Sequence, residues 1–135
     1  MSIELAVLRP GDALPARGFG PITRATLALY AGGSGDYNPM HIDSDFARRA
    51  GSPDVFAHSM LSMAYLAQYL RGLAPQDKLR SWNVRFTAIT PVNAKVTCSA
   101  SVVTIDDNRR EATLALSARI DDGTETVSGG AVISF

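Results

Sequence analysis

The residues with the clearest chemical potential lie in the segment Gly35-Asp36-Tyr37-Asn38-Pro39-Met40-His41, which places a carboxylate and an imidazole five residues apart. On a helix, at about 100° per residue, side chains at this spacing point in widely different directions. Pro39 also disfavours helical backbone at Asn38. We therefore expect a turn that directs Asp36 and His41 toward one point. A carboxylate and a neutral imidazole around one water molecule form a proton-transfer site.

Each of these side chains also has an ordinary structural explanation. Asp36 alone is typical of a helix cap or a turn, and His41 alone is typical of a hydrogen-bonded structural histidine. Their combination with Asn38-Pro39, and with the helix expected downstream, favours a catalytic interpretation. His58, at the start of that helix, is interpreted as structural. The spacing of His41, His58 and the carboxylates does not match a zinc-ligand pattern, so we expect no metal.

Two further types of site are excluded by their local context. Gly32-Gly33-Ser34-Gly35 follows a predicted helix and lacks the strand-turn-helix unit of a dinucleotide loop. Ser59 and Ser62 lie outside any nucleophile elbow, which argues against acyl-enzyme chemistry. We expect no cofactor.

Three helices are predicted around the Asp36–His41 segment. Thr23 is the predicted N-cap of a helix that runs to about Ala31 and stops at Gly32-Gly33. A short helix capped by Asp43 or Ser44 should end at Gly51. The stretch 57–70 is apolar on nearly every face, which predicts a buried helix, with Gly72 as its stop.

After Pro75 the sequence becomes rich in Val, Ile, Thr and Phe, which predicts four strands joined by short turns. Consecutive strands of this kind form an antiparallel sheet, so the fold class is α+β with a curved sheet wrapped around the long helix. A single copy leaves a sheet edge and part of the helix exposed, and pairing edge to edge with a second copy would cover both. The strands are expected at 79–88, 94–105, 111–120 and 124–135, with at most a short additional one around 3–8.

Composition sets the wider limits. The 135 residues suit a single domain, 1–135, and 46% hydrophobic with 19% charged residues is typical of a globular chain. Thirteen basic residues balance thirteen acidic ones, so we expect no nucleic-acid partner and no membrane anchor. The lone Cys98 excludes an internal disulfide and fits a cytoplasmic location. No signal peptide and no membrane span are predicted.

Three motifs resemble one family. The segment 34–43 resembles the hydratase motif of MaoC-like (R)-specific enoyl-CoA hydratases, and Phe56-Ala57-His58-Ser59-Met60-Leu61 resembles the start of that family's long helix, A-H-G-M-L. The segment 84–92, VRFTAITPV, resembles its V-R-F-x-x-P-V strand. The resemblance implies the hot-dog fold, a central helix wrapped by a curved antiparallel sheet, and a dimer.

The resemblance also implies the reaction, which is reversible hydration of a trans-2-enoyl thioester to the (R)-3-hydroxyacyl thioester. In this family Asp36 and His41 would hold the catalytic water, and Asn38 would support them. Backbone N–H groups near Ser59, where the family commonly has glycine, would receive the thioester oxygen. The sequence leaves open which of the two takes the proton of water and which delivers one to C2. Our hypothesis favours Asp36 as base, with His41 positioning the water and relaying its proton. Apolar residues of the long helix should line the acyl pocket: Met60, Met63, Ala64 and Ala67.

The expected substrate is an acyl thioester of either CoA or acyl carrier protein, and the expected assembly is a homodimer or a dimer-based oligomer. A heterodimer with a related subunit is also compatible with this reading. Two other functions are compatible with the same fold. One is a hot-dog acyl-CoA thioesterase, although such enzymes generally lack the Asp-x-Asn-Pro-x-His arrangement. The other is a non-catalytic acyl-thioester-binding subunit of a heteromeric dehydratase.

Overall fold

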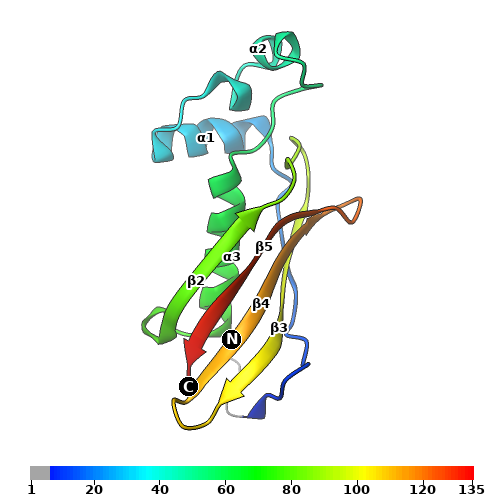
Figure 1. The fold of residues 1–135 in the computed structure, drawn as a ribbon. Coiled ribbons are helices and arrows are strands. Elements are labelled where there is room, and N and C mark those ends of the chain that lie inside the picture. Colours follow the sequence, from blue (N-terminus) through cyan, green and yellow to red (C-terminus); the bar gives the residue numbers. More distant parts are fainter. Residues whose placement is uncertain (1–6) are drawn as a thin grey trace.

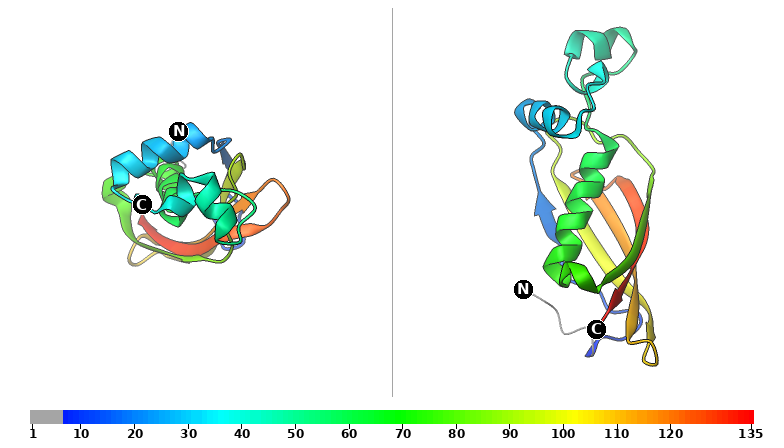
Figure 2. Two further views of the ribbon diagram at one scale, coloured as in Figure 1. Left: turned by 90° about the horizontal axis from the view of Figure 1, so that it is seen from above. Right: turned by 90° about the vertical axis from the view of Figure 1, so that its left-hand side faces the viewer.

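The computed structural model describes residues 7–135, in which a curved antiparallel sheet wraps around one long helix (Figures 1 and 2). Two shorter helices lie beyond the N-terminal end of the long one. The predicted α+β architecture is therefore present. In chain order the elements are β1 (Arg17–Phe19), α1 (Arg24–Ser34), the 3₁₀ turn η2 (Pro39–His41), α2 (Ser44–Arg49), α3 (Ser59–Leu73), the 3₁₀ turn η3 (Gln76–Lys78), β2 (Leu79–Phe86), β3 (Val96–Asp106), β4 (Glu111–Ile120) and β5 (Glu125–Ser134).

The sheet has the strand order β1-β3-β4-β5-β2, and its neighbouring strands are all antiparallel. The four strands predicted after Pro75 are all found, with β4 at the predicted bounds and the others shifted by up to two residues at an end. The three-residue strand β1 was not predicted, because glycine and proline surround it. Of the strand predicted around residues 3–8, residues 3–6 lie outside the described part of the chain, and Val7 and Leu8 are not in a strand.

Helix α1 starts as predicted but ends later. The Thr23 hydroxyl accepts the Thr26 N–H at 3.1 Å. The prediction that Gly32-Gly33 stops the helix is wrong, because α1 runs on to Ser34. Glycine inside a helix costs only about 1 kcal/mol, whereas termination needs a residue with left-handed backbone. Gly35 supplies it, with φ 76°, and donates its N–H to Ala31.

The boundaries of the other two helices follow a similar pattern. Asp43 caps α2, as predicted, and accepts the Phe46 N–H at 3.0 Å. Helix α3 begins at Ser59, because the preceding Ala57 donates its N–H to Thr90 across the fold at 2.8 Å. The predicted stop at Gly72 is wrong, since α3 continues through it to Leu73, and Pro75 then prevents further helix.

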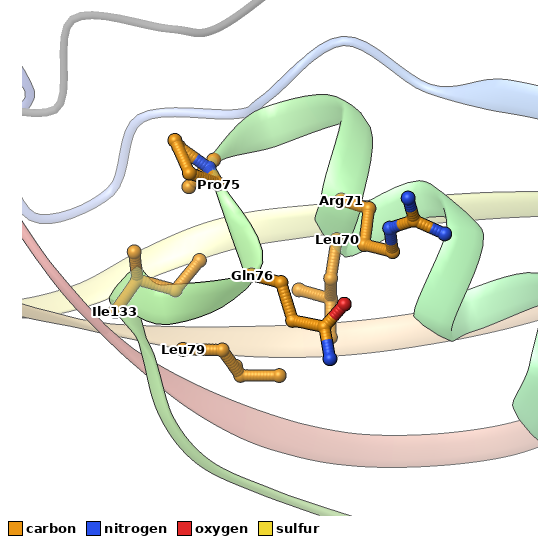
Figure 3. Close-up of a pocket in the computed structure, with 7 residues that line it drawn as sticks. Leu70, Arg71, Pro75, Gln76, Leu79 and Ile133 are labelled. Carbon is orange, nitrogen blue, oxygen red and sulfur yellow. The ribbon is translucent and has the colours of Figure 1, made fainter.

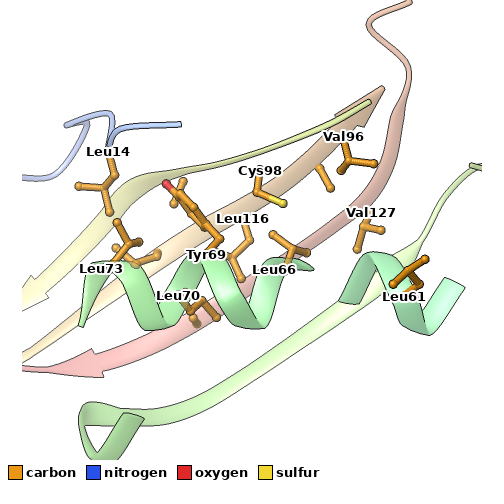
Figure 4. Packing of buried hydrophobic residues seen from close by; sticks show 14 of the residues in the cluster. Leu14, Leu61, Leu66, Tyr69, Leu70, Leu73, Val96, Cys98, Leu116 and Val127 are labelled. Atoms are coloured by element: carbon orange, nitrogen blue, oxygen red, sulfur yellow. The ribbon is translucent and has the colours of Figure 1, made fainter. Parts of the chain in front are cut away.

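The core lies between α3 and the sheet (Figure 4). The sheet-facing side of α3 is buried, whereas Met60 on another side is 53% exposed. A single copy therefore leaves part of α3 uncovered, as expected from its apolar faces. The labelled core residues that α3 contributes are Leu61, Leu66, Tyr69, Leu70 and Leu73.

Strand β2 forms one edge of the sheet, and within residues 7–135 its one strand partner is β5. Strand β2 lies very close to β5. A Cβ atom on Gly129 would overlap the backbone oxygen of Asn83, so this position needs glycine. Near the end of β2, Phe86 is 42% exposed and Ile89 is 61% exposed. No helix within residues 7–135 has the length and apolar character needed to cross a membrane.

Candidate active site

The predicted turn between Asp36 and His41 forms, and it is stabilised by its own side chains. The Asp36 carboxylate oxygen Oδ1 accepts the Asn38 N–H at 3.2 Å, and Asn38 Oδ1 accepts the Met40 N–H at 3.0 Å. Such bonds let Asp and Asn replace the backbone partners of a regular helix. Asn38 thus caps η2, which ends at His41. The supporting role predicted for Asn38 has a structural basis in this cap.

The turn brings Asp36 and His41 together. Asp36 Oδ2 lies 4.0 Å from His41 Nε2, and the two side chains are 52% and 11% exposed, respectively. His41 Nδ1 lies 2.7 Å from the carbonyl oxygen of Phe56. Because a carbonyl only accepts hydrogen bonds, Nδ1 carries the hydrogen in neutral His41. The Nε2 lone pair is then free and faces the Asp36 carboxylate.

His58 belongs to the same cluster, which the sequence did not indicate. Its ring stacks on His41 with centroids 3.9 Å apart and planes inclined by 27°. Its Nε2 lies 3.1 Å from the backbone oxygen of Asp36, so this nitrogen is the donor. The residue is only 1% exposed, and its Nδ1 has no hydrogen-bond partner among the described residues. The sequence signal was weak, because His58 differs from an ordinary structural histidine only through contacts made after folding.

Burial lowers the pKa of His58 below its usual 6.5, and a charge on His41 would lower it further. The hydrogen bond to the Asp36 carbonyl and the Asp36 carboxylate act in the opposite direction but do not outweigh burial. A proton on Nδ1 would also be buried without an acceptor. His58 is therefore held neutral.

Two further rings enclose the histidine pair. Tyr30 of α1 meets His58 edge to face at 4.7 Å, and Phe56 meets His41 edge to face at 5.2 Å. Burial raises the pKa of Tyr30, and the nearby Asp36 carboxylate raises it further. We call Tyr30, His58, His41 and Phe56 the ring stack. It connects α1 to the segment before α3.

An ion pair anchors that segment to α1. Arg24 forms two hydrogen bonds with Asp54, at 2.6 and 2.9 Å. This pairing lowers the pKa of Asp54 to about 2. Arg48 of α2 lies 3.8 Å from the same carboxylate. Phe56, whose carbonyl orients His41, lies two residues after Asp54. The ion pair therefore helps to hold that carbonyl in place.

The cluster is poorly arranged for a metal ion, although one potential ligand atom each from Asp36, His41 and His58 lies within 4.8 Å of the others. Ligand lone pairs lie in the imidazole plane, and the planes of His41 and His58 are stacked almost parallel. Their lone pairs therefore do not converge at the roughly 2.0–2.1 Å needed around one zinc ion. The arrangement suits a water molecule between His41 and Asp36 better.

Residues 7–122 match the model of the MaoC like domain, which covers most of the chain. The chain belongs to the MaoC-like domain family. No curated protein sequence matches it.

Solved structures support the hot-dog fold of this MaoC-like domain. The (R)-hydratase from A. caviae involved in PHA biosynthesis is 23% identical with a TM-score of 0.83, over 96% of this chain and 98% of that one. R-hydratase PhaJ1 from Pseudomonas aeruginosa is 25% identical with a TM-score of 0.83, over 95% of this chain and 82% of that one. The ChsH1–ChsH2 complex from Mycobacterium tuberculosis is 21% identical with a TM-score of 0.80, over 94% and 98%.

Ser59 is the first helical residue of α3 in this MaoC-like domain and directly follows His58. The first N–H groups of a helix have no intrahelical acceptor, and His58 forms no side-chain cap here. The positive end of the helix dipole adds to these donors. The location predicted for an oxyanion-binding N–H is thus next to the histidine pair.

The predicted acyl-pocket residues lie on the less covered side of α3. Met60 is exposed, while Met63, Ala64 and Ala67 are partly buried. The sheet-facing side is filled by the core instead. A pocket at these four residues would therefore need a covering surface from outside the single chain, and their role remains a prediction.

A small apolar hollow lies at the other end of α3 (Figure 3). Leu70, Leu79 and Ile133 are among its lining residues, and its water-accessible volume of about 10 Å³ holds roughly one water molecule. This space is too small for an acyl chain in the described conformation.

Proposed function

We propose that this MaoC-like domain reversibly hydrates a trans-2-enoyl thioester, of CoA or acyl carrier protein, to the (R)-3-hydroxyacyl thioester. The observation that carries the proposal is the pair of acceptors, Asp36 Oδ2 and His41 Nε2, 4.0 Å apart. A water molecule at about 2.8 Å from each would make an angle of roughly 90° at its oxygen, close to its own H–O–H angle. Both hydrogens of that water are then directed to the protein, and its lone pairs face outward.

This geometry suits attack by the water oxygen on C3 of the enoyl thioester, which is electron-poor. The water oxygen bonds to C3, one of its hydrogens passes to a base, and C2 receives a hydrogen. Neutral His41 carries its hydrogen on Nδ1, toward Phe56, and has none at Nε2 to give. The hydrogen that reaches C2 is therefore the one removed from water. In our proposal Asp36 removes it, and His41 positions the water and takes part in the relay.

Negative charge develops on the thioester oxygen as the C2 side becomes an enolate. The N–H of Ser59 at the start of α3 is the proposed donor to that oxygen. A single preorganised donor of this kind typically lowers the barrier by about 3 kcal/mol. The Ser59 side chain, in place of the family's usual glycine, would restrict space beside the thioester.

The proposed assembly is a homodimer that pairs through the edge of β2. Among the described residues, no strand pairs with the outer side of β2, and the exposed Phe86 and Ile89 lie near its end. A heterodimer with a related subunit is the alternative, supported by the two-component complex from M. tuberculosis among the similar structures. We further propose that residues 1–135 form one domain. We also propose a cytoplasmic location, which cell fractionation would test.

Two assays on the purified protein test the reaction. With crotonyl-CoA, a hydratase removes the enoyl-thioester absorbance band without releasing free thiol, and chiral analysis should identify the (R)-3-hydroxy product. Thiol release would instead identify a thioesterase. A folded protein that produces neither signal with CoA and carrier-protein thioesters of several chain lengths would contradict the proposal and support a non-catalytic binding subunit.

A further inference from the structure

The second histidine of the ring stack has no role in the mechanism above, yet its environment is unusual. His58 is 1% exposed and donates from Nε2 to the Asp36 carbonyl, which leaves Nδ1 buried without a partner. Buried polar atoms without a hydrogen bond are rare and unfavourable. An apolar residue of similar shape would avoid this cost, so the presence of an imidazole at this buried position calls for a functional explanation.

We propose that His58 is a positioning residue that sets the separation between the Asp36 carboxylate and His41 Nε2. It would do so through its hydrogen bond to the Asp36 backbone and through its stacking on the His41 ring. This inference rests on the proposed hydratase function and adds a residue to its machinery.

The first contact acts on Asp36, whose side chain is half exposed. The carboxylate is held on one side, where Oδ1 accepts the Asn38 N–H. The main chain is held on the other side, where the carbonyl accepts from His58. With both groups fixed, Oδ2 remains free and faces His41. The Asp36 N–H also bonds to Ser34 Oγ at 3.1 Å, so the loss of His58 would leave this residue anchored through its N–H and through Asn38 but without the bond to its carbonyl.

The second contact acts on the His41 ring. His58 covers one face of the ring at 3.9 Å, and Phe56 contacts it through an edge-to-face arrangement and accepts from Nδ1. These contacts restrict rotation of the imidazole, so the Nε2 lone pair keeps its direction. Tyr30 closes the far side of His58 and completes the ring stack.

The same arrangement also determines the charge of His58. The titratable groups that face His58 are Tyr30 from α1, Asp36 from the turn and His41 from η2. Burial keeps His58 neutral, and a second positive charge 3.9 Å from an imidazolium would be unfavourable. His58 therefore contacts its neighbours as a neutral ring.

Two substitutions separate the two contacts. His58→Phe keeps a flat ring but removes the donor, whereas His58→Gln keeps a donor nitrogen at similar reach but removes the ring. Ser62→Ala is the matched control, because Ser62 is equally buried in the first turn of α3 and its side chain contacts Thr90 instead. Steady-state kinetics with crotonyl-CoA, on variants shown to be folded by circular dichroism, give kcat and KM separately.

We expect His58→Phe to lower kcat by about 10- to 100-fold with KM within about twofold, because small displacements of reacting groups have effects of this size. His58→Gln should retain more of kcat than His58→Phe, and Ser62→Ala should remain close to the parent protein. A folded His58→Phe with normal kcat overturns the proposal. A His58→Gln variant no better than His58→Phe overturns the role of the carbonyl bond.

A spectroscopic measurement tests the geometry independently of activity. The chain has only two histidines, so ¹⁵N NMR of the imidazoles can be assigned with one variant. We expect His58 as the Nε2–H tautomer and His41 as the Nδ1–H tautomer near neutral pH. The opposite tautomer at His58 overturns the inference even if the protein is an active hydratase. An inactive parent protein with the expected tautomers instead refutes the proposed function and leaves the geometry supported.

Discussion

At the scale of single residues, the chemistry depends on which His41 nitrogen carries the hydrogen. The Phe56 carbonyl holds it on Nδ1, and this leaves Nε2 as an acceptor opposite Asp36 Oδ2. Two acceptors rather than an acceptor and a donor can orient both hydrogens of one water. In the proposed mechanism, the pair therefore removes a proton from water before any proton is donated.

Removing either acceptor should therefore abolish most of the activity. We expect Asp36→Asn and His41→Ala each to lower kcat for crotonyl-CoA hydration by at least about 100-fold, since general acid–base groups typically contribute 10²–10⁴-fold. Circular dichroism should show both variants folded. Asp45→Asn, which removes an exposed carboxylate of α2, is the control and should leave kcat unchanged. Near-normal hydration by Asp36→Asn would refute the assignment of the base.

The lowered pKa of His58 predicts a specific dependence of stability on pH. Below about pH 6.5 the unfolded chain takes up a proton at this residue, whereas the folded chain remains unprotonated until its lower pKa is reached. The free energy of unfolding should therefore fall as pH falls through this window, by at most about 1.4 kcal/mol per pH unit for one proton. Above pH 6.5 His58 is unprotonated in both the folded and the unfolded chain, so the protein loses no stability through this residue.

Urea denaturation at pH 7.5 and pH 5.5 would measure this effect. The parent protein should lose more stability between the two values than His58→Phe, which has no group to titrate at this position. Equal losses in the two proteins would show that His58 titrates normally and is not held neutral.

At the scale of elements, the start of α3 combines two functions. Its first N–H groups have no intrahelical acceptors, and the preceding residue, His58, contacts both Asp36 and His41. The start of this one helix thus contributes two groups. The N–H of Ser59 is the proposed oxyanion donor, and the ring of His58 packs against the proposed water-binding pair. The ion pair between Arg24 and Asp54 helps to keep the connecting segment in place.

A proline at the first position of α3 tests the oxyanion donor without breaking the helix. Proline is well accepted at this position, and the extended backbone of His58, with φ −57° and ψ 132°, is compatible with a following proline. Ser59→Pro removes the N–H and should lower kcat by about 10²–10³-fold. Ser59→Gly keeps the N–H and should retain activity, with a change in acyl preference if the side chain narrows the pocket. Full activity of a folded Ser59→Pro variant would exclude this N–H as the donor.

At the scale of the whole molecule, the single chain is incomplete on one side. Helix α3 is covered by the sheet on one face, while Met60 remains exposed on another and β2 remains a free edge. A second copy that pairs along β2 would extend the sheet and remove this edge. The predicted acyl-pocket residues would then gain a covering surface that the isolated chain lacks.

Light scattering coupled to size-exclusion chromatography should therefore give twice the mass of one chain. Replacing Phe86 and Ile89 together by lysine should shift the protein toward the monomer, because lysines on a sheet edge oppose pairing. A lysine on the opposite edge strand, introduced by Arg17→Lys, keeps the charge of that strand and should leave the dimer intact. A parent protein that is monomeric at micromolar concentration would contradict the proposed pairing.

The sequence determined the local structure wherever short-range chemistry dominates. Thr23 and Asp43 cap helices as predicted, and the alternating β-branched residues after Pro75 form strands. Asp36, Asn38 and His41 form a turn because their side chains bond to nearby backbone groups. The predictions failed at Gly32-Gly33 and Gly72, which stay helical at little cost because none of them adopts left-handed backbone, and at β1, whose three residues form a strand only through pairing with β3.

The surroundings of the turn, by contrast, depend on contacts between distant parts of the chain. The tautomer of His41 depends on a carbonyl 15 residues away, and the role of His58 depends on the backbone of Asp36, 22 residues away. Hydrogen bonds and ring contacts of this kind exist only once α1, η2 and the start of α3 have packed together. The candidate acid and base could thus be identified from local sequence, whereas the way their atoms are held depends on the fold.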